Sequence, residues 1–97
     1  KDPGAGATAL HYAVMKGEMP LVALLVQRGA DVNSRTKSGT TPLHTAVLYG
    51  RFEVTEYLLD KGSEINAKSA SGVTPLSLAD AAHCQRIAKL LRERGAR

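Results

Sequence analysis

The sequence is poor in cysteine and in aromatic residues. It contains one cysteine, Cys84, one phenylalanine and no tryptophan, and aromatic residues make up 4% of the chain. A single cysteine cannot close a disulfide within the chain, which favours a reducing compartment, the cytoplasm or the nucleus. No apolar run approaches the roughly 18 residues of a membrane-spanning helix, and no secretory signal is visible at the start. These absences favour a soluble intracellular protein.

Aliphatic residues must therefore supply the interior. Hydrophobic residues make up 43% of the 97 residues, so the core is expected to consist mainly of alanine, leucine, valine and isoleucine, which suit closely packed helices. A chain of this length is expected to form a single domain over residues 1–97. Because it begins at Lys1 without a methionine, we expect it to be a piece of a longer protein.

A repeat of 33 residues runs through the chain. Shifting the sequence by this period superposes sets of equivalent residues, among them Thr8, Thr41 and Thr74; Leu10, Leu43 and Leu76; Ala13, Ala46 and Ala79; Leu21, Val54 and Ile87; and Gly29, Gly62 and Gly95. Such a period is typical of stacked repeats, in which each unit buries its apolar face against its neighbours. The three repeats span approximately residues 1–35, 36–68 and 69–97.

Each repeat is predicted to contain two helices joined by turns, as the middle copy illustrates. Thr41 stands at an N-cap position, where its hydroxyl can accept a bond from a free backbone N–H. Pro42 follows at the first helical position, where its missing N–H costs nothing. This helix is expected to end at Gly50. A second helix is expected from about residue 52 to residue 61, with Gly62 closing it.

The segments TALHYA, TPLHTA and TPLSLA, which begin at Thr8, Thr41 and Thr74, resemble the ankyrin repeat. The resemblance covers the whole chain and implies an all-α solenoid of stacked antiparallel helix pairs joined by β-hairpin-like turns. It also implies that the histidine of the segment, His11 or His44, bonds to the threonine and to the backbone near the next turn. The histidines are therefore expected to stabilise the fold.

Catalysis or metal binding at the histidines is the alternative. His11 and His44 lie one repeat apart, and no Asp, Glu or Cys shares their helix face at ligand spacing. His83 and Cys84 are adjacent, but two ligands do not close a zinc site, and Cys84 is expected to pack as a small hydrophobe. No phosphate loop, serine elbow or paired-acid motif is present. We expect no enzyme activity, no cofactor and no metal.

A non-catalytic protein-binding module inside a larger chain is the expected function. In ankyrin arrays the contact face is the concave one, formed by the projecting turns and the outer positions of the first helix of each pair. Carried over residue by residue, this face comprises Met15, Lys16, Arg35, Lys37, Ser38, Thr40, Leu48, Tyr49, Lys68, Ser71 and Val73, together with Ala5, Ala7, Ala70, Ala81 and Ala82. Taken singly, each is also ordinary surface.

Tyr49 is the strongest candidate for a contact residue, because exposed aromatic residues with a polar tip are enriched at interface centres. It is expected to form an apolar stripe with Leu48 and Met15. Basic residues flank this stripe at Lys16, Arg35, Lys37 and Lys68. We expect a monomeric module whose protein partner carries an apolar anchor and acidic neighbours.

A regulatory segment of a larger enzyme is the second interpretation. Residues 75–79, followed by Ile87 and by residues 90–92, are similar to the closing repeat of ankyrin-containing Arf GTPase-activating proteins. Much of this likeness is repeat consensus. A zinc-ribbon cysteine cluster elsewhere in the full-length protein would distinguish the two interpretations, since none is present here.

The net charge of +4 arises in the last twelve residues. Residues 1–85 contain eight basic and eight acidic side chains, whereas residues 86–97 contain five basic side chains and Glu93. The excess suits either a tail that binds nucleic acid or acidic lipid, or a solvated face that closes the stack. The second is favoured and nucleic acid is not expected as a partner, because no groove-reading motif or stacking aromatic residues accompany the charge.

Departures from the repeat pattern lie at both ends. In the last unit Ser77 replaces the histidine, His83 replaces the glycine between the helices, and Arg92 stands in the position of Leu59. Polar residues on the outer side are expected of a capping repeat. The first helix is as apolar as an interior one, so we expect the array to continue before Lys1 or to be covered there.

Asn33 and Asn66 are candidate modification sites. Each ends a pattern, Leu then Asp/Glu-Val/Ile-Asn eight positions later, that oxygen-dependent asparaginyl hydroxylases recognise in many ankyrin proteins. The same asparagines also suit a turn held by side-chain to backbone bonds. The two interpretations stay open, because the motif is nearly inseparable from the repeat consensus.

Overall fold

A computed structural model describes residues 3–36 and 39–96, with side chains from Ala9 onward. The described residues form six helices in three consecutive pairs: α1 (Pro3–Lys16) with α2 (Met19–Gln27), α3 (Pro42–Leu48) with α4 (Phe52–Asp60), and α5 (Pro75–Ala81) with α6 (Gln85–Glu93). The middle pair starts at the predicted residues. No helix in this part of the chain has the length and apolar character needed to cross a membrane.

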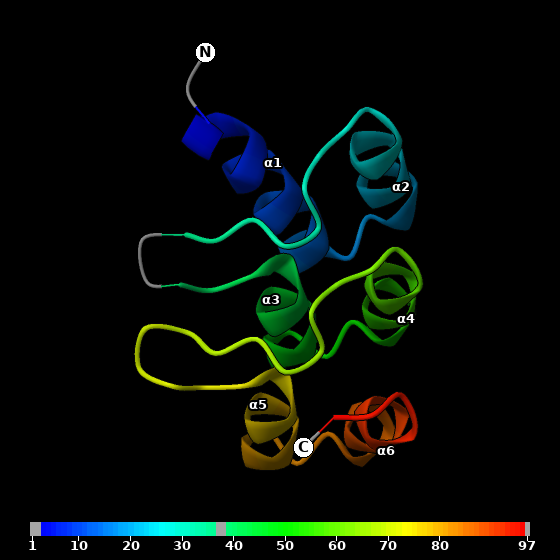
Figure 1. Cartoon of the computed structure of the whole chain (residues 1–97). Coiled ribbons are helices and arrows are strands. Elements are labelled where there is room, and N and C mark those ends of the chain that lie inside the picture. The colour runs from blue at the N-terminus through cyan, green and yellow to red at the C-terminus, as the bar shows by residue number, and fades with distance from the viewer. Residues whose placement is uncertain (1–2, 37–38, 97) are drawn as a thin grey trace.

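The three helix pairs stack side by side. Helices α1, α3 and α5 form one column and α2, α4 and α6 form a second, and each helix contacts its counterpart in the neighbouring pair (Figure 1). After the second column the chain projects away from the helices in a turn and returns to begin the next pair (Figure 1). The stack measures 37 × 28 × 20 Å. This arrangement confirms the predicted all-helical solenoid.

Helices α3 and α5 each begin at a threonine–proline pair. Thr41 has an extended backbone, and its hydroxyl accepts a bond from His44 N at 3.3 Å. Thr74 accepts in the same way from Ser77 N at 3.1 Å. Proline disfavours a helical conformation in the residue before it. Each threonine is therefore kept outside the helix, where it caps the first turn.

The first pair departs from this pattern. The repeat alignment places Thr8 at the cap, yet α1 begins at Pro3 and runs through Thr8. Ala9 stands where the other two pairs have proline, so the sequence does not force Thr8 out of the helix. Residues 3–16 consequently form one helix, and Ala5 and Ala7, predicted to lie in a projecting turn, belong to it.

The two projecting turns resemble short hairpins, although no strand occurs in residues 3–36 and 39–96. In the first turn Thr36 N donates to Thr40 O at 3.0 Å, and the equivalent bond in the second turn measures 2.9 Å. Gly39 has a φ of +77°, and a Cβ atom there would lie 2.7 Å from Ala70 N. Glycine is therefore required where the two turns approach each other.

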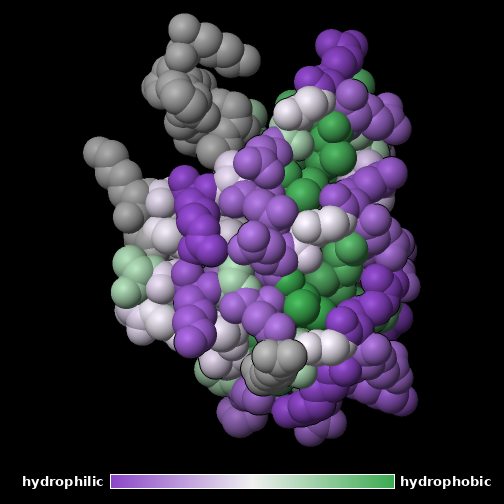
Figure 2. Space-filling view, viewed as in Figure 1, coloured by the Kyte–Doolittle hydropathy of each residue, from purple (hydrophilic) through white to green (hydrophobic). Residues whose placement is uncertain are grey.

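A continuous aliphatic core fills the space between the two columns. Its largest buried apolar side chains come from all three pairs, namely Leu10, Val14, Val22, Leu43, Val47, Leu58, Ile87 and Leu91. Figure 2 shows apolar surface gathered in two places between the columns, beside the loops and bordered by hydrophilic residues. The core follows the predicted composition of aliphatic residues and alanine.

The first pair leaves part of this interior uncovered. Leu21 is 37% exposed, whereas its equivalents Val54 and Ile87 are 2% and 1% exposed. Leu24 is also exposed, while its equivalent Leu90 is buried. Helix α2 packs against α4 and α4 against α6, but no helix of the described residues covers the other side of α2. The same repeat position is thus interior in two units and surface in the first.

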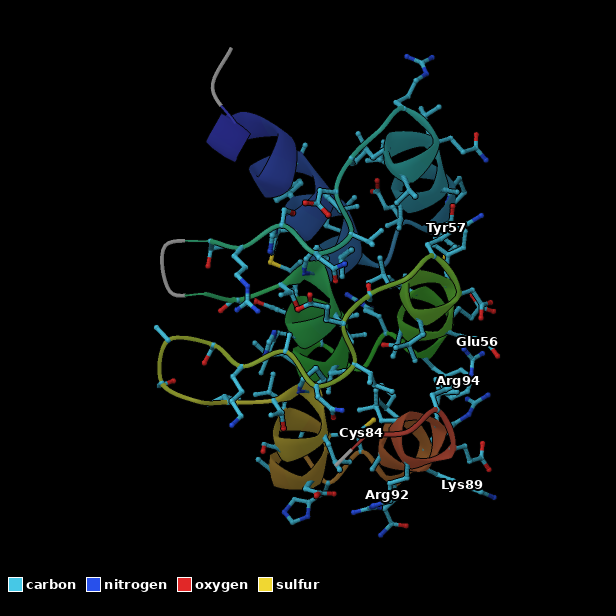
Figure 3. The ribbon with its side chains drawn as sticks, in the orientation of Figure 1. Glu56, Tyr57, Cys84, Lys89, Arg92 and Arg94 are labelled. Carbon is cyan, nitrogen blue, oxygen red and sulfur yellow. The ribbon has the colours of Figure 1, made fainter. Side chains whose placement is uncertain are left out.

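A salt bridge lies at the opposite end of the stack. Asp80 and Arg92 occupy the positions of Val47 and Leu59 in the middle pair. Arg92 Nη2 lies 3.2 Å from Asp80 Oδ1, and Figure 3 shows Arg92 on the outer side of α6. Charged side chains therefore face solvent where the middle pair places aliphatic ones against its neighbour.

Other arginines of the last repeat also contact the stack. Arg94 Nη1 lies 3.0 Å from Asp60 Oδ1, which links the end of α6 to α4 (Figure 3). The Arg86 guanidinium lies 4.1 Å from the ring centroid of Phe52. These contacts give Arg86 and Arg94 partners within the stack.

His83 adopts the left-handed backbone conformation that glycine has in the other pairs. Its φ is +57°, and the equivalent residues Gly17 and Gly50 have φ values of +70° and +69°. A side chain in this conformation costs about 1 kcal/mol or more. This strain exceeds the stability that a glycine loses through the greater conformational entropy of the unfolded chain.

We expect His83→Gly to raise the free energy of unfolding, measured by urea denaturation, by about 0.5 kcal/mol. His83→Ala is the control and should give no gain; an equal gain would contradict relief of strain.

Candidate protein-binding face

His44 joins the start of α3 to the turn that precedes α5. The residue is buried, with 1% of its surface exposed. Its Nδ1 accepts a bond from Thr41 N at 3.1 Å and lies 2.8 Å from Thr41 Oγ1, and its Nε2 lies 2.7 Å from Val73 O. A carbonyl oxygen only accepts, so Nε2 carries the proton. The neutral ring therefore connects two repeats.

His11 makes the corresponding contact one pair earlier. Its Nε2 lies 3.0 Å from Thr40 O in the turn before α3. Both histidines thus reach the next turn, as the repeat resemblance implied. In the third pair Ser77 bonds locally, with its hydroxyl 3.0 Å from the Thr74 hydroxyl. The described part of the chain contains no group of three or more His, Cys, Asp or Glu side chains that suits a metal ion.

Burial lowers the pKa of His44 below its ordinary value of 6.5. The bond to Val73 O opposes this shift, and the nearby Arg35 guanidinium adds to it. At pH values between the two pKa values, the His44 imidazole is therefore mostly protonated in the unfolded chain and mostly neutral in the folded chain. We expect the stability that His44 contributes to be present above pH 6.5 and to be lost as the pH falls through the lower, folded-state pKa.

Urea denaturation between about pH 8 and pH 5 measures this dependence, whose slope for one proton is at most about 1.4 kcal/mol per pH unit. The variant His44→Gln is the control, because it retains a polar side chain but does not titrate. Its free energy of unfolding should fall less steeply on acidification. An unchanged slope would assign the pH dependence to another group.

Two hollows lie between the projecting turns and the first column of helices. The first has a volume of about 470 Å³ and a mainly apolar lining. Its lining residues come from α1, the first turn and α3: His11, Tyr12, Met15, Thr36, Thr40, Thr45, Leu48 and Tyr49. Four residues predicted for the contact face, Met15, Thr40, Leu48 and Tyr49, are thereby brought together.

The second hollow lies between α3 and α5 and has a volume of about 200 Å³. Its lining residues are Thr40, His44, Leu48, Ser69, Ser71, Val73 and Leu78. Ser71 and Val73 were predicted for the contact face. Since Thr40 and Leu48 line both hollows, the two are neighbours, and together they are called the groove below.

The most exposed apolar side chains of the groove lie around the first hollow. Leu48 is 56% exposed, Tyr12 is 55% exposed and Tyr49 is 48% exposed. Tyr12 was not predicted as a contact residue, and its equivalent in α3, Thr45, is buried. The signal available in the sequence was its size, because an aromatic residue replaces a small one at this position. The first hollow therefore gathers three large, exposed side chains.

Arg35, predicted as a contact residue, connects the two projecting turns. Its Nη1 donates to Gly39 O at 3.1 Å and to Lys68 O at 2.7 Å, and its Nη2 lies 3.6 Å from Glu64 Oε1. Arg35 lines neither hollow. These bonds give the guanidinium a structural role in holding the turns together.

Lysines lie beside the groove. Lys16 Nζ is 5.4 Å from the ring centroid of Tyr12, at the edge of the first hollow. Lys68 is exposed and directly precedes a residue that lines the second hollow. Lys37 and Ser38, which were also predicted for the contact face, lie outside the described residues. Of the predicted alanines, Ala70, Ala81 and Ala82 are exposed and line neither hollow.

Arg51 supports the groove and was not indicated by the repeat pattern. Its Nε and Nη2 donate to Met15 O at 3.0 and 2.7 Å, near the C-terminal end of α1, where helix carbonyls lack partners within the helix. The equivalent residues are Glu18 and Cys84, so the alignment gives no signal for this contact. Arg51 thus fixes the backbone of a residue that lines the first hollow.

Asn33 holds neighbouring loops together. Its Nδ2 donates to Gly62 O at 3.1 Å, and its Oδ1 accepts from Glu64 N at 2.6 Å. This contact fits the predicted role in side-chain to backbone bonding and extends it to the next repeat. Asn66 is exposed at the equivalent place in the second loop. Cys84 is half-buried and packs against the core, as predicted for a small hydrophobe.

Comparison with known proteins agrees with this geometry. The family model for ankyrin repeats in three copies matches residues 1–69. A search of the curated proteins found no match. The structure carries the repeat beyond the matched residues, since α5 begins at a threonine–proline pair and packs with α6 as the earlier helices do. The chain therefore belongs to the ankyrin repeat family.

Proposed function

We propose that this chain is a non-catalytic module that binds a protein partner in the groove. Ankyrin repeats are generally protein–protein interaction modules. The proposal rests on one observation above all, namely that the first hollow gathers Tyr12, Leu48 and Tyr49, all large and exposed, around Met15. Large side chains that converge on a hollow supply the anchoring contacts of an interface.

The chemistry of the groove indicates what the partner carries. A large apolar side chain of the partner would remove the exposed surface of Leu48 and Tyr49 from water. None of the residues lining either hollow is acidic, and Lys16 and Lys68 lie beside them. Carboxylates next to the apolar anchor would complement these charges and speed association.

Truncating the first hollow is expected to abolish most partner binding. The double variant Met15→Ala, Tyr49→Ala should weaken binding by at least about 10-fold, because two apolar side chains lose their contacts. The matched control is Leu21→Ala, Leu24→Ala, which removes exposed apolar atoms from the first pair outside the groove. Affinity capture from a cell lysate with each tagged protein, quantified by mass spectrometry, compares them.

We expect the wild type and the Leu21, Leu24 control to capture the same partner proteins, and we expect the groove variant to lose them. Circular dichroism and thermal unfolding establish that all three proteins are folded. Equal retention by the groove variant and the wild type would remove the groove as the binding site.

A further inference from the structure

We infer that the partner segment is an α-helix that places two apolar side chains, seven residues apart, into the two hollows on either side of Leu48. The inference rests on the proposed function and specifies the form of the ligand. It follows from the spacing of the hollows, the shape of the ridge between them and the charges beside them.

The spacing of the hollows selects the helix. The first lies between α1 and α3 and the second between α3 and α5, so they are one repeat apart. Packed helices lie roughly 8–10 Å apart, and the two anchors must be separated by about the same distance. Residues i and i+7 of an α-helix share a face and are about 10.5 Å apart. Same-face residues of a strand are about 6.7 or 13 Å apart, which fits less well.

The ridge between the hollows also suits a helix. Leu48 lines both hollows and is the most exposed large apolar residue of the groove. On a helix the residues i, i+3, i+4 and i+7 surround a depression that receives one side chain of a facing helix. Leu48 fits that depression while the outer pair, i and i+7, enters the two hollows. All three apolar contacts are then made at once.

The two anchors differ in size. The first hollow, of about 470 Å³, is bordered by Tyr12, Met15 and Tyr49 and accommodates an aromatic side chain. The second, of about 200 Å³, has Val73 and Leu78 in its wall and accommodates a smaller aliphatic one. The partner helix therefore carries its larger anchor at the end next to α1.

Charge complementarity identifies the flanks of the partner helix. Lys16 lies over Tyr12 at the edge of the first hollow, and the exposed Lys68 directly precedes a residue that lines the second. Arg35 already has Glu64 as a partner at 3.6 Å. Carboxylates on the partner helix outside its two anchors complement these two lysines.

Synthetic helical peptides test the inference directly. The matched probe has about sixteen residues on an alanine–glutamate background, with tryptophan at the fourth position and leucine at the eleventh. The controls move the leucine to the eighth position, replace it by alanine, exchange glutamate for lysine, or carry the same two anchors three residues apart in a proline-rich segment. NMR titration of the full chain follows the methyl signals of Met15, Leu48 and Val73.

We expect the matched peptide to bind at least about 10-fold more tightly than every control, because only it buries both anchors beside complementary charges. It should shift the Met15 and Val73 methyl signals together. The nearly isosteric variant Val73→Thr should bind the matched peptide more weakly. It should bind the single-anchor peptide, in which alanine replaces the leucine, as tightly as the wild type does.

Two failures are distinguishable. If the single-anchor or the proline-rich peptide binds as tightly as the matched one, or if the Val73 methyl signals do not move, the two-anchor helix is wrong while the groove remains a binding face. If no peptide moves the Met15 or Leu48 signals, the proposed function fails as well.

Discussion

Replacing His44 by alanine is expected to lower the free energy of unfolding by about 3 kcal/mol. The change leaves Thr41 N without its side-chain partner, removes one of the two bonds to Val73 O and empties space in the interior. A buried polar group that loses its bond costs about 1–3 kcal/mol. Since a domain of this size has a total stability of roughly 5–15 kcal/mol, the variant loses a large part of it.

Thermal unfolding followed by circular dichroism measures the loss, for which we expect a fall in Tm of about 15 °C. His11→Ala is the matched control, because His11 reaches Thr40 O as His44 reaches Val73 O but is only half-buried. Its loss should be near 1 kcal/mol. If the two variants are destabilised equally, burial does not explain the importance of His44.

Replacing Leu58 by alanine should have a similarly large effect, about 3 kcal/mol. Leu58 is fully buried in α4, the middle helix of the second column. The deleted atoms leave a cavity that the packed neighbours fill only in part. The loss of stability therefore exceeds the free energy of transferring the deleted atoms to water. Because Leu58 lines neither hollow, partner binding below the unfolding temperature should be unchanged.

Leu21→Ala deletes the same atoms from the same column of helices one repeat earlier. Leu21 is exposed on the uncovered side of α2, so its loss should cost less than about 1 kcal/mol. Urea denaturation of both variants gives the comparison. A large effect at Leu21 would mean that this surface is covered in the protein in solution.

The histidine contacts and the groove share two residues, Val73 and Thr40. Val73 receives the His44 bond at its backbone carbonyl and also lines the second hollow. Thr40 has the same double role between His11 and both hollows. The bonds that hold neighbouring repeats together therefore also position the walls of the candidate site.

Local signals in the sequence were sufficient for most of the fold. The threonine–proline pairs at Thr41 and Thr74 determine where α3 and α5 begin, because proline acts on the residue just before it. The 33-residue period predicted stacking, since a helix pair exposes an apolar face that a neighbour must cover. Motif positions were also sufficient to name Met15, Leu48, Tyr49 and Val73, which the structure places in the groove.

Local signals failed where a residue depends on its neighbours in space. The alignment makes Leu21 equivalent to Val54, yet only Val54 is buried, because burial requires a helix on the other side. Arg35 binds the carbonyl of Lys68 in the next turn, a contact that only stacking brings within reach and that no local signal indicates.

By itself, the sequence determined the repeat, the starts of α3 and α5 and the aliphatic core, because these follow from short-range backbone preferences and from a period. Only the tertiary structure decided which equivalent residues are interior, which polar groups bind across repeats and that two hollows meet at Leu48. Those outcomes depend on distances between segments about 30 residues apart, which only packing sets.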